Sequence, residues 1–186
     1  MESNTFRELY IEELKDLYDA ENQLIEALPK MAAASSSAEL RAGFEAHLQQ
    51  TRGHAIRLEQ ILASLGEDAK GKKCKAIRGL VAEGGDIIDS DFEGAVKDAG
   101  LIGAAQSVEH YEIAAYGTAR AFAEILGDNS GVRLLEQTLE EEKETNDKLS
   151  ELSETINAEA AELAVPIDEE ASERDEPRRK AKSAGR

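Results

Sequence analysis

Ionisable residues occupy core positions in four long amphipathic segments of this chain. Apolar residues recur every three or four positions along each segment, and residues with this spacing share one face of a helix. Glutamates interrupt three of these apolar stripes, and histidines interrupt the other. The interrupting residues are Glu21, His47, His54, Glu109, Glu112 and Glu142. A chain with this pattern has to fold so that several ionisable groups enter its core.

The glutamates on these stripes need a partner. Burying a lone ionised carboxylate is very unfavourable, so buried charges are paired, protonated or bound to a metal. No Lys or Arg lies on the stripes. The four glutamates carry four negative charges, which two divalent ions would neutralise once neutral His54 joins them as a nitrogen ligand. Iron and manganese suit such mixed carboxylate and imidazole ligation, so a metal site is the simplest interpretation.

Each glutamate also has a purely structural interpretation. A single glutamate such as Glu21 can be a solvated residue at the edge of a helix face. Glu109 and Glu112 are a stronger signal, because two like charges one turn apart repel each other unless a cation lies between them. Three further glutamates of the last segment are expected on its solvated side: Glu140, Glu141 and Glu144.

The polar residues of the second segment are less specific. For His47 we favour a hydrogen-bonded core histidine, whereas for His54 a metal ligand and a core residue stay equally open. Gln50 lies about one turn from both histidines and either ligates weakly or only forms hydrogen bonds.

Two tyrosines and a cysteine complete the candidate residues. Tyr111 and Tyr116 flank the paired glutamates, and core packing is the favoured role for both. Cys74 follows lysines that would lower the pKa of its thiol. The favoured interpretation is nevertheless a small residue that anchors a short helix.

The same periodicity predicts an all-α fold. Helices are expected over residues 3–34, 37–65, 98–126 and 132–163, with a short helix inside the long connection 67–98. Ser36 and Glu39 predict a capping box at the start of the second helix. Hairpin, long crossover and hairpin together give a ferritin-like four-helix bundle with one crossover connection.

Composition agrees with this plan. We expect one bundle domain over residues 1–165 and a disordered, charged, solubilising tail over residues 166–186. The formal net charge of −17 makes nucleic acid an unsuitable partner and favours attraction of cations. A single cysteine excludes an internal disulfide framework. With no 18-residue apolar run and no signal-peptide pattern, we expect a cytoplasmic protein without a membrane partner.

Several stretches resemble the YciF/YciE-like branch of the ferritin-like superfamily. They are LYDAENQL (17–24), HLQQTR (47–52), KCKA (73–76), VEHYEIAAYGT (108–118) and TLEEEK (138–143). The resemblance covers about residues 4–162, and the 108–118 stretch is its most specific part. It implies a ferritin-like bundle, a rubrerythrin-like dimetal site, a bacterial stress-response setting and a homodimer.

The chain also departs from the ferritin and rubrerythrin pattern, which carries Glu-x-x-His on the second and fourth helices. Gln50 stands where a bridging carboxylate is expected, and Asn146 follows Glu142 where a histidine is expected. Glu109 and Glu112 would compensate by supplying two carboxylates from one helix. Occupation of the second metal position therefore stays open.

Three hypotheses follow from these observations. The leading one is a dimetal-carboxylate protein that binds iron, or manganese, and acts on peroxide or oxygen under stress. Its ligands would be Glu21, Gln50, His54, Glu109, Glu112 and Glu142. The alternatives are a non-enzymatic stress or interaction protein built on a dimeric bundle, and a DNA-protecting storage shell.

Overall fold

The computed structural model describes residues 5–163, and these fold into helices without strands. The helices are α1 (Phe6–Ala34), α2 (Ala38–Ser64), α3 (Lys75–Asp89), α4 (Gly94–Leu126) and α5 (Asn129–Glu162). This confirms the predicted all-α class. The predicted tail over residues 166–186 lies outside the described residues. Within residues 5–163, no helix is both long and apolar enough to cross a membrane.

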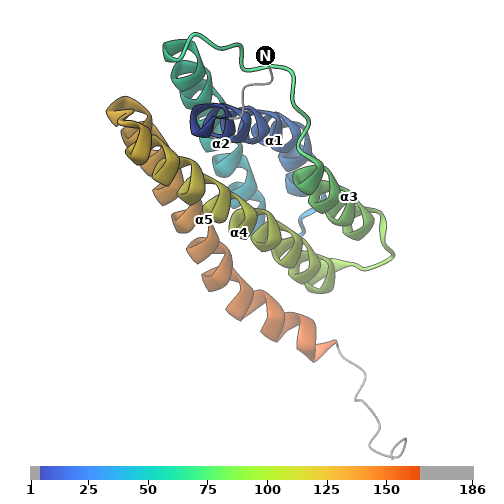
Figure 1. The fold of residues 1–186 in the computed structure, drawn as a ribbon. Helices are drawn as coiled ribbons and strands as arrows, with labels where there is room; N and C mark the ends of the chain where they lie inside the picture. The colour runs from blue at the N-terminus through green and yellow to red at the C-terminus, as the bar shows by residue number, and fades with distance from the viewer. Residues whose placement is uncertain (1–4, 164–186) are drawn as a thin grey trace, which may run out of the picture.

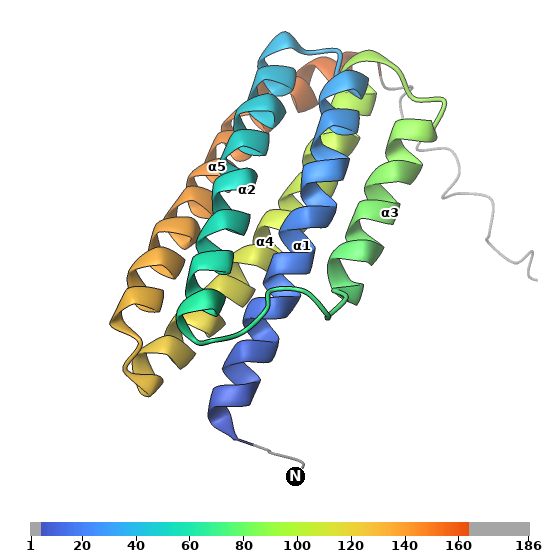
Figure 2. The same cartoon turned by 90° about the horizontal axis from the view of Figure 1, so that it is seen from above.

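Two antiparallel hairpins, α1–α2 and α4–α5, form the bundle (Figures 1 and 2). Helix α2 packs against α5 and α1 packs against α4, while α3 covers α1 and α4 from outside. The connection between α2 and α4 runs the length of the bundle and carries α3 (Figure 2). This is the predicted single crossover.

The helix ends differ in detail from the predictions. Ser37, not Ser36, caps α2, and its side chain accepts a hydrogen bond from the Leu40 amide. The predicted capping box is wrong because the amides of Ser36 and Ser37 both donate to the carboxylate of Asp98 on α4. This contact ties the α1–α2 turn to the second hairpin. Helix α4 accordingly begins before Asp98, at Gly94, and α5 begins at Asn129 because Asp128 caps it.

The core consists of two apolar clusters, one towards each end of the bundle. Leu24, Phe44 and Leu149 belong to one cluster, and Leu17 and Leu135 belong to the other. Each long helix contributes to both clusters and carries its buried glutamates or histidines between them. The polar residues therefore form a layer at mid-height, enclosed by hydrocarbon above and below.

Candidate metal centre

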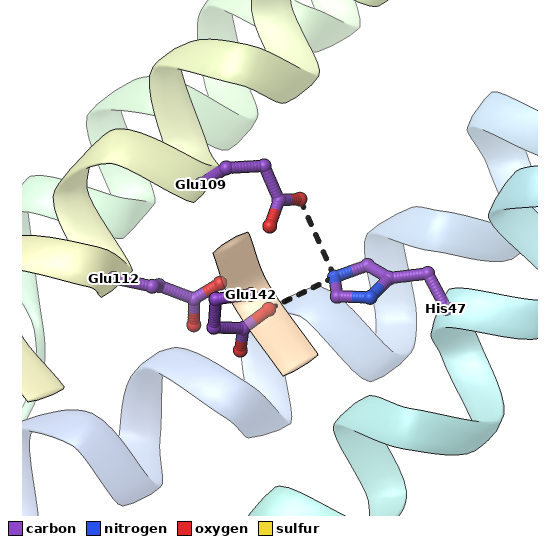
Figure 3. Close-up of side chains that lie close together, drawn as sticks. All are labelled: His47, Glu109, Glu112 and Glu142. Atoms are coloured by element: carbon purple, nitrogen blue, oxygen red, sulfur yellow. Dashed lines mark ion pairs between the residues drawn. The ribbon is translucent and has the colours of Figure 1, made fainter. Parts of the chain in front are cut away.

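Helices α2, α4 and α5 bring His47, Glu109, Glu112 and Glu142 together in this layer (Figure 3). All four are buried, and each offers a ligand atom within 4.8 Å of those of the others. His47 Nε2 lies 3.3 Å from Glu109 Oε1 and 3.7 Å from Glu142 Oε2. A cation placed among these atoms would have one nitrogen and several oxygen ligands.

A second group adjoins the first. Glu21 of α1, His54 of α2 and Glu142 of α5 also place ligand atoms within 4.8 Å of one another. His54 Nδ1 lies 2.9 Å from Glu142 Oε1 and 3.5 Å from Glu21 Oε1. Glu142 thus directs one oxygen towards each histidine, which is the placement of a bridging carboxylate between two cation positions.

The unmet hydrogen-bonding capacity of this layer fits a bound cation. Among the described residues, its buried oxygens without a hydrogen-bond partner are Glu21 Oε2, Glu109 Oε2, both of Glu112 and both of Glu142. His54 Nδ1 is close to Glu142, yet the two are not aligned as a hydrogen bond. Buried polar atoms are normally satisfied, and a group left unsatisfied requires an explanation. Convergent lone pairs without donors are what metal coordination needs.

The pKa shifts of the buried glutamates also favour a bound cation. Burial raises the pKa of Glu112 well above its usual range, and the charges of Glu21 and Glu142 add to this effect. Burial and the nearby Glu142 raise the pKa of Glu109 in the same manner. Burial also raises the pKa of Glu21, although His54 opposes it. Without a cation, the protein has to keep some of these carboxyls protonated.

One histidine of the layer stays cationic in the metal-free protein. Burial alone would lower the pKa of His54, but Glu142 and Glu21 outweigh it and raise this pKa to about 10. In the metal-free protein, the proton on His54 therefore neutralises part of the negative charge of the glutamates. Two divalent ions would neutralise this charge on binding.

His47 is oriented as a ligand as well as hydrogen-bonded. Thr145 Oγ1 donates its proton to the Glu141 carbonyl oxygen at 3.0 Å, so it can only accept from His47 Nδ1, 3.2 Å away. The ring proton is thereby placed on Nδ1, and the lone pair of Nε2 faces Glu109 and Glu142. Burial lowers the pKa of His47, which keeps the ring neutral. His47 is therefore a buried, hydrogen-bonded histidine, as the favoured interpretation holds, and its second ring nitrogen also faces two carboxylates.

Glu141 differs most from its expected place. Its carboxylate is not on the solvated side of α5: Oε2 lies 2.9 Å from His54 Nε2, and Arg57 donates to both of its oxygens. These hydrogen bonds, with Arg57 first, outweigh burial and lower the pKa of Glu141. Glu140 and Glu144 are exposed, as predicted. Arg57, one turn from His54 on α2, was the sequence signal for a carboxylate partner on this face.

The structure gives the remaining predicted residues more specific contacts. Gln50 is half-buried, and its Oε1 lies 3.4 Å from His47 Nδ1, which matches its hydrogen-bonding interpretation. Tyr116 is fully buried as expected, and its hydroxyl also donates a hydrogen bond to Glu21 Oε1. Tyr111 points away from this contact, donating to Asp16 at 3.0 Å and lying 3.2 Å from the Cys74 sulfur.

Cys74 anchors α3, as the favoured interpretation holds. It precedes the first residue of α3, is buried, and donates its amide hydrogen to Asp19 on α1 at 2.8 Å. The expected lowering of its thiol pKa by lysines is wrong, because burial and Asp16 raise the pKa. The lysines lie elsewhere: Lys73 bonds Asp19, and Lys72 bonds the Glu12 carbonyl.

Comparisons with known proteins agree with this architecture. The family model described as "Domain of unknown function (DUF892)" matches residues 5–162. Protein YciF of Escherichia coli K12 is 45% identical over 154 residues, which are 82% of this chain and 93% of YciF.

Two solved structures share the fold. The crystal structure of the E. coli stress protein YciF superposes with a TM-score of 0.81 and 43% identity, over 84% of this chain and 99% of that one. A ferritin-like, diiron-carboxylate protein from Bacillus anthracis superposes with a TM-score of 0.64 and 19% identity, over 81% and 99% of the two chains. This more distant match supports the fold alone. The chain therefore has a ferritin-like fold, is similar to YciF, and belongs to the DUF892 family.

Proposed function

We propose that this protein is a ferritin-like dimetal-carboxylate protein that binds iron, with manganese as the alternative metal, and acts on peroxide or oxygen under stress. The observation that carries the proposal is the set of buried, unsatisfied carboxylate oxygens grouped with two histidines. A purely structural bundle gains nothing from burying them, because each one destabilises the core.

The geometry supports a specific ligand set. One position would use His47, Glu109 and Glu112, and the other would use Glu21 and His54. Glu142 would belong to both positions. Compared with the set predicted from sequence, His47 replaces Gln50, whose contact with His47 suits a supporting role. Four carboxylates and two neutral histidines would match the charge of two divalent ions.

The chain's own residues contribute orientation and exclusion of water. A redox-active ion held here would exchange electrons with peroxide or oxygen. Tyr116 fixes Glu21 by its hydrogen bond, and Thr145 fixes the tautomer of His47. The apolar clusters on both sides keep bulk water from the carboxylates. The name of the relative YciF as a stress protein supports the stress setting.

Metal content tests the proposal directly. The protein should be expressed without a metal-affinity tag, purified, and measured by elemental analysis. One or two equivalents of iron or manganese, together with consumption of hydrogen peroxide by the iron-loaded protein, are expected. Absence of metal, with the same thermal stability in chelator, would contradict the proposal and favour the non-enzymatic scaffold.

The homodimer and the cytoplasmic location remain part of this proposal. Phe6 and Leu9 at the start of α1 and Ile125 at the end of α4 are exposed apolar side chains, which supports self-association. Light scattering measures the mass in solution. A mass of twice the chain supports a dimer, whereas a much larger assembly would indicate a storage shell.

Glu141 provides a prediction about metal affinity. Its carboxylate holds His54 by the outer nitrogen, and loss of such a partner of a ligating histidine weakens metal binding about 10-fold or more. Glu141→Ala should therefore raise the dissociation constant for Mn²⁺, measured by calorimetry. Glu140→Ala is the matched control, because Glu140 is the exposed neighbour and pairs only with Lys143 in the described structure. Equal dissociation constants for the two variants would contradict the role of Glu141.

A further inference from the structure

The two cation positions differ in how they are covered. On the His54 side, Glu141 contacts His54 Nε2 and accepts a hydrogen bond from Arg57. Tyr116 donates a hydrogen bond to Glu21. His54 and Glu21 are both completely inaccessible to solvent. On the other side, His47 and Glu109 border a pocket between α2 and α5. Access from solvent is therefore one-sided.

This pocket runs from exposed residues to the buried metal ligands. Its outer residues Gly43, Ala46 and Lys148 are exposed, whereas His47 and Glu109 at its inner end are buried. Its volume is about 60 Å³, well below the roughly 150 Å³ of a cavity that binds benzene. A single water needs roughly 10–15 Å³ of such space, so the pocket accepts only molecules of a few heavy atoms.

The residues that line the pocket favour binding of an uncharged molecule. Apolar side chains of Phe44, Leu149 and Leu152 line most of the pocket. Lys148 at the outer end disfavours the approach of cations. At the inner end, Gln50 and Thr145 supply the hydrogen-bonding groups beside His47. Small uncharged molecules suit these walls better than ions or larger organic substrates.

We infer that this pocket is the entrance and docking site of the small neutral oxidant, dioxygen or hydrogen peroxide, and that the oxidant meets the centre on its His47 side. The inference rests on the proposed function and adds to it the position of the substrate. Gln50, considered from sequence as a metal ligand, becomes instead a residue that contacts the substrate.

Gly43 allows the pocket to be closed without disturbing the core. A Cβ atom added there meets no atom within 4 Å, and the position is exposed on α2. Gly43→Leu should fill the pocket and at the same time favour the helix. Gly103→Leu is the matched control, because Gly103 is an exposed glycine of α4 that is equally unobstructed and lies outside the pocket. Ala46→Leu closes the same pocket from a second position.

Xenon tests the pocket without any metal. Crystals of the metal-free protein under xenon pressure should show a xenon atom beside Phe44 and Leu149 in the wild type and in Gly103→Leu, but not in Gly43→Leu. Absence of xenon from the wild-type pocket would overturn the inference and would leave the metal proposal standing.

Rates with the iron-loaded protein complete the test. Gly43→Leu and Ala46→Leu should lower the second-order rate constants for both oxidants about 10-fold, within the range over which association rates vary among variants. Their iron content should stay at the wild-type value. Gln50→Leu should slow peroxide more than dioxygen, because only peroxide is a strong hydrogen-bonding partner. Wild-type rates in both plugged variants would overturn the inference, whereas a wild-type protein that binds no metal would overturn the proposed function itself.

Discussion

Replacing Glu112 with alanine is expected to remove most of the metal that the protein binds. Glu112 is completely buried, and neither of its oxygens has a hydrogen-bond partner in the described structure. No hydrogen bond therefore explains the burial of this carboxylate, whereas metal ligation would explain it. Glu144→Ala, on the exposed side of α5, should leave the metal content at the wild-type value. Elemental analysis of both variants after dialysis measures the difference.

A second substitution at this position, Glu112→Gln, separates loss of a metal ligand from loss of the fold. Burial and neighbouring carboxylates raise the pKa of Glu112, so keeping this carboxyl in the core at neutral pH destabilises the metal-free protein relative to the unfolded chain. Glu112→Gln should therefore bind less metal and yet melt at a higher temperature than the metal-free wild type. Equal metal content in Glu112→Ala and Glu144→Ala would show that Glu112 does not ligate.

Metal removal is expected to lower the melting temperature substantially. A ligand that binds only the folded state stabilises it by about 2.7 kcal/mol at 100 times its dissociation constant. For a domain of this size that free energy corresponds to a shift of about 5–11 °C. Calorimetry of the Mn²⁺-loaded and chelator-treated protein at pH 7 measures the shift. Identical melting temperatures for the two forms would contradict metal binding by the folded core.

The increase in melting temperature on metal binding should depend on pH in a definite direction. Glu109 and Glu112 have raised pKa values in the folded, metal-free protein, so folding favours their protonated forms. Their unfavourable contribution is absent below the unfolded-state pKa and grows as the pH rises through and above it. Metal binding requires the ionised carboxylates and competes with protons. The gain in melting temperature should therefore be largest near neutral pH and shrink as the pH falls towards 5.

The amino-acid pattern alone predicts the helices and the inward register of the polar layer. Spacing within one helix decides which face Glu21, Glu109 and Glu142 occupy, and that face is buried in the structure. Helix ends are less predictable, because Asp98 of a distant helix engages the turn before α2. A capping pattern read from four consecutive residues cannot include such a partner.

The roles of His47 and Glu141 depend on contacts between helices. His47 is oriented by Thr145, which lies 98 residues away in the chain, and Glu141 is held by Arg57, 84 residues away. The rotation of α5 relative to α2 decides both contacts, and no local spacing encodes that rotation. The pKa of Cys74 differs from its prediction for the same reason, since burial outweighs the charges of adjacent lysines.

A single turn of α5 supports the outer nitrogens of both histidines. Thr145 accepts from His47, and Glu141, whose carbonyl receives the Thr145 proton, contacts His54. A displacement of this turn would therefore move both imidazoles, and the metal affinities of the two proposed positions would change together. A substitution that changes the metal affinity of one position alone then has to be at a residue near only one ring. Gln50 is such a residue for His47, and Tyr116, which acts through Glu21, is such a residue for His54.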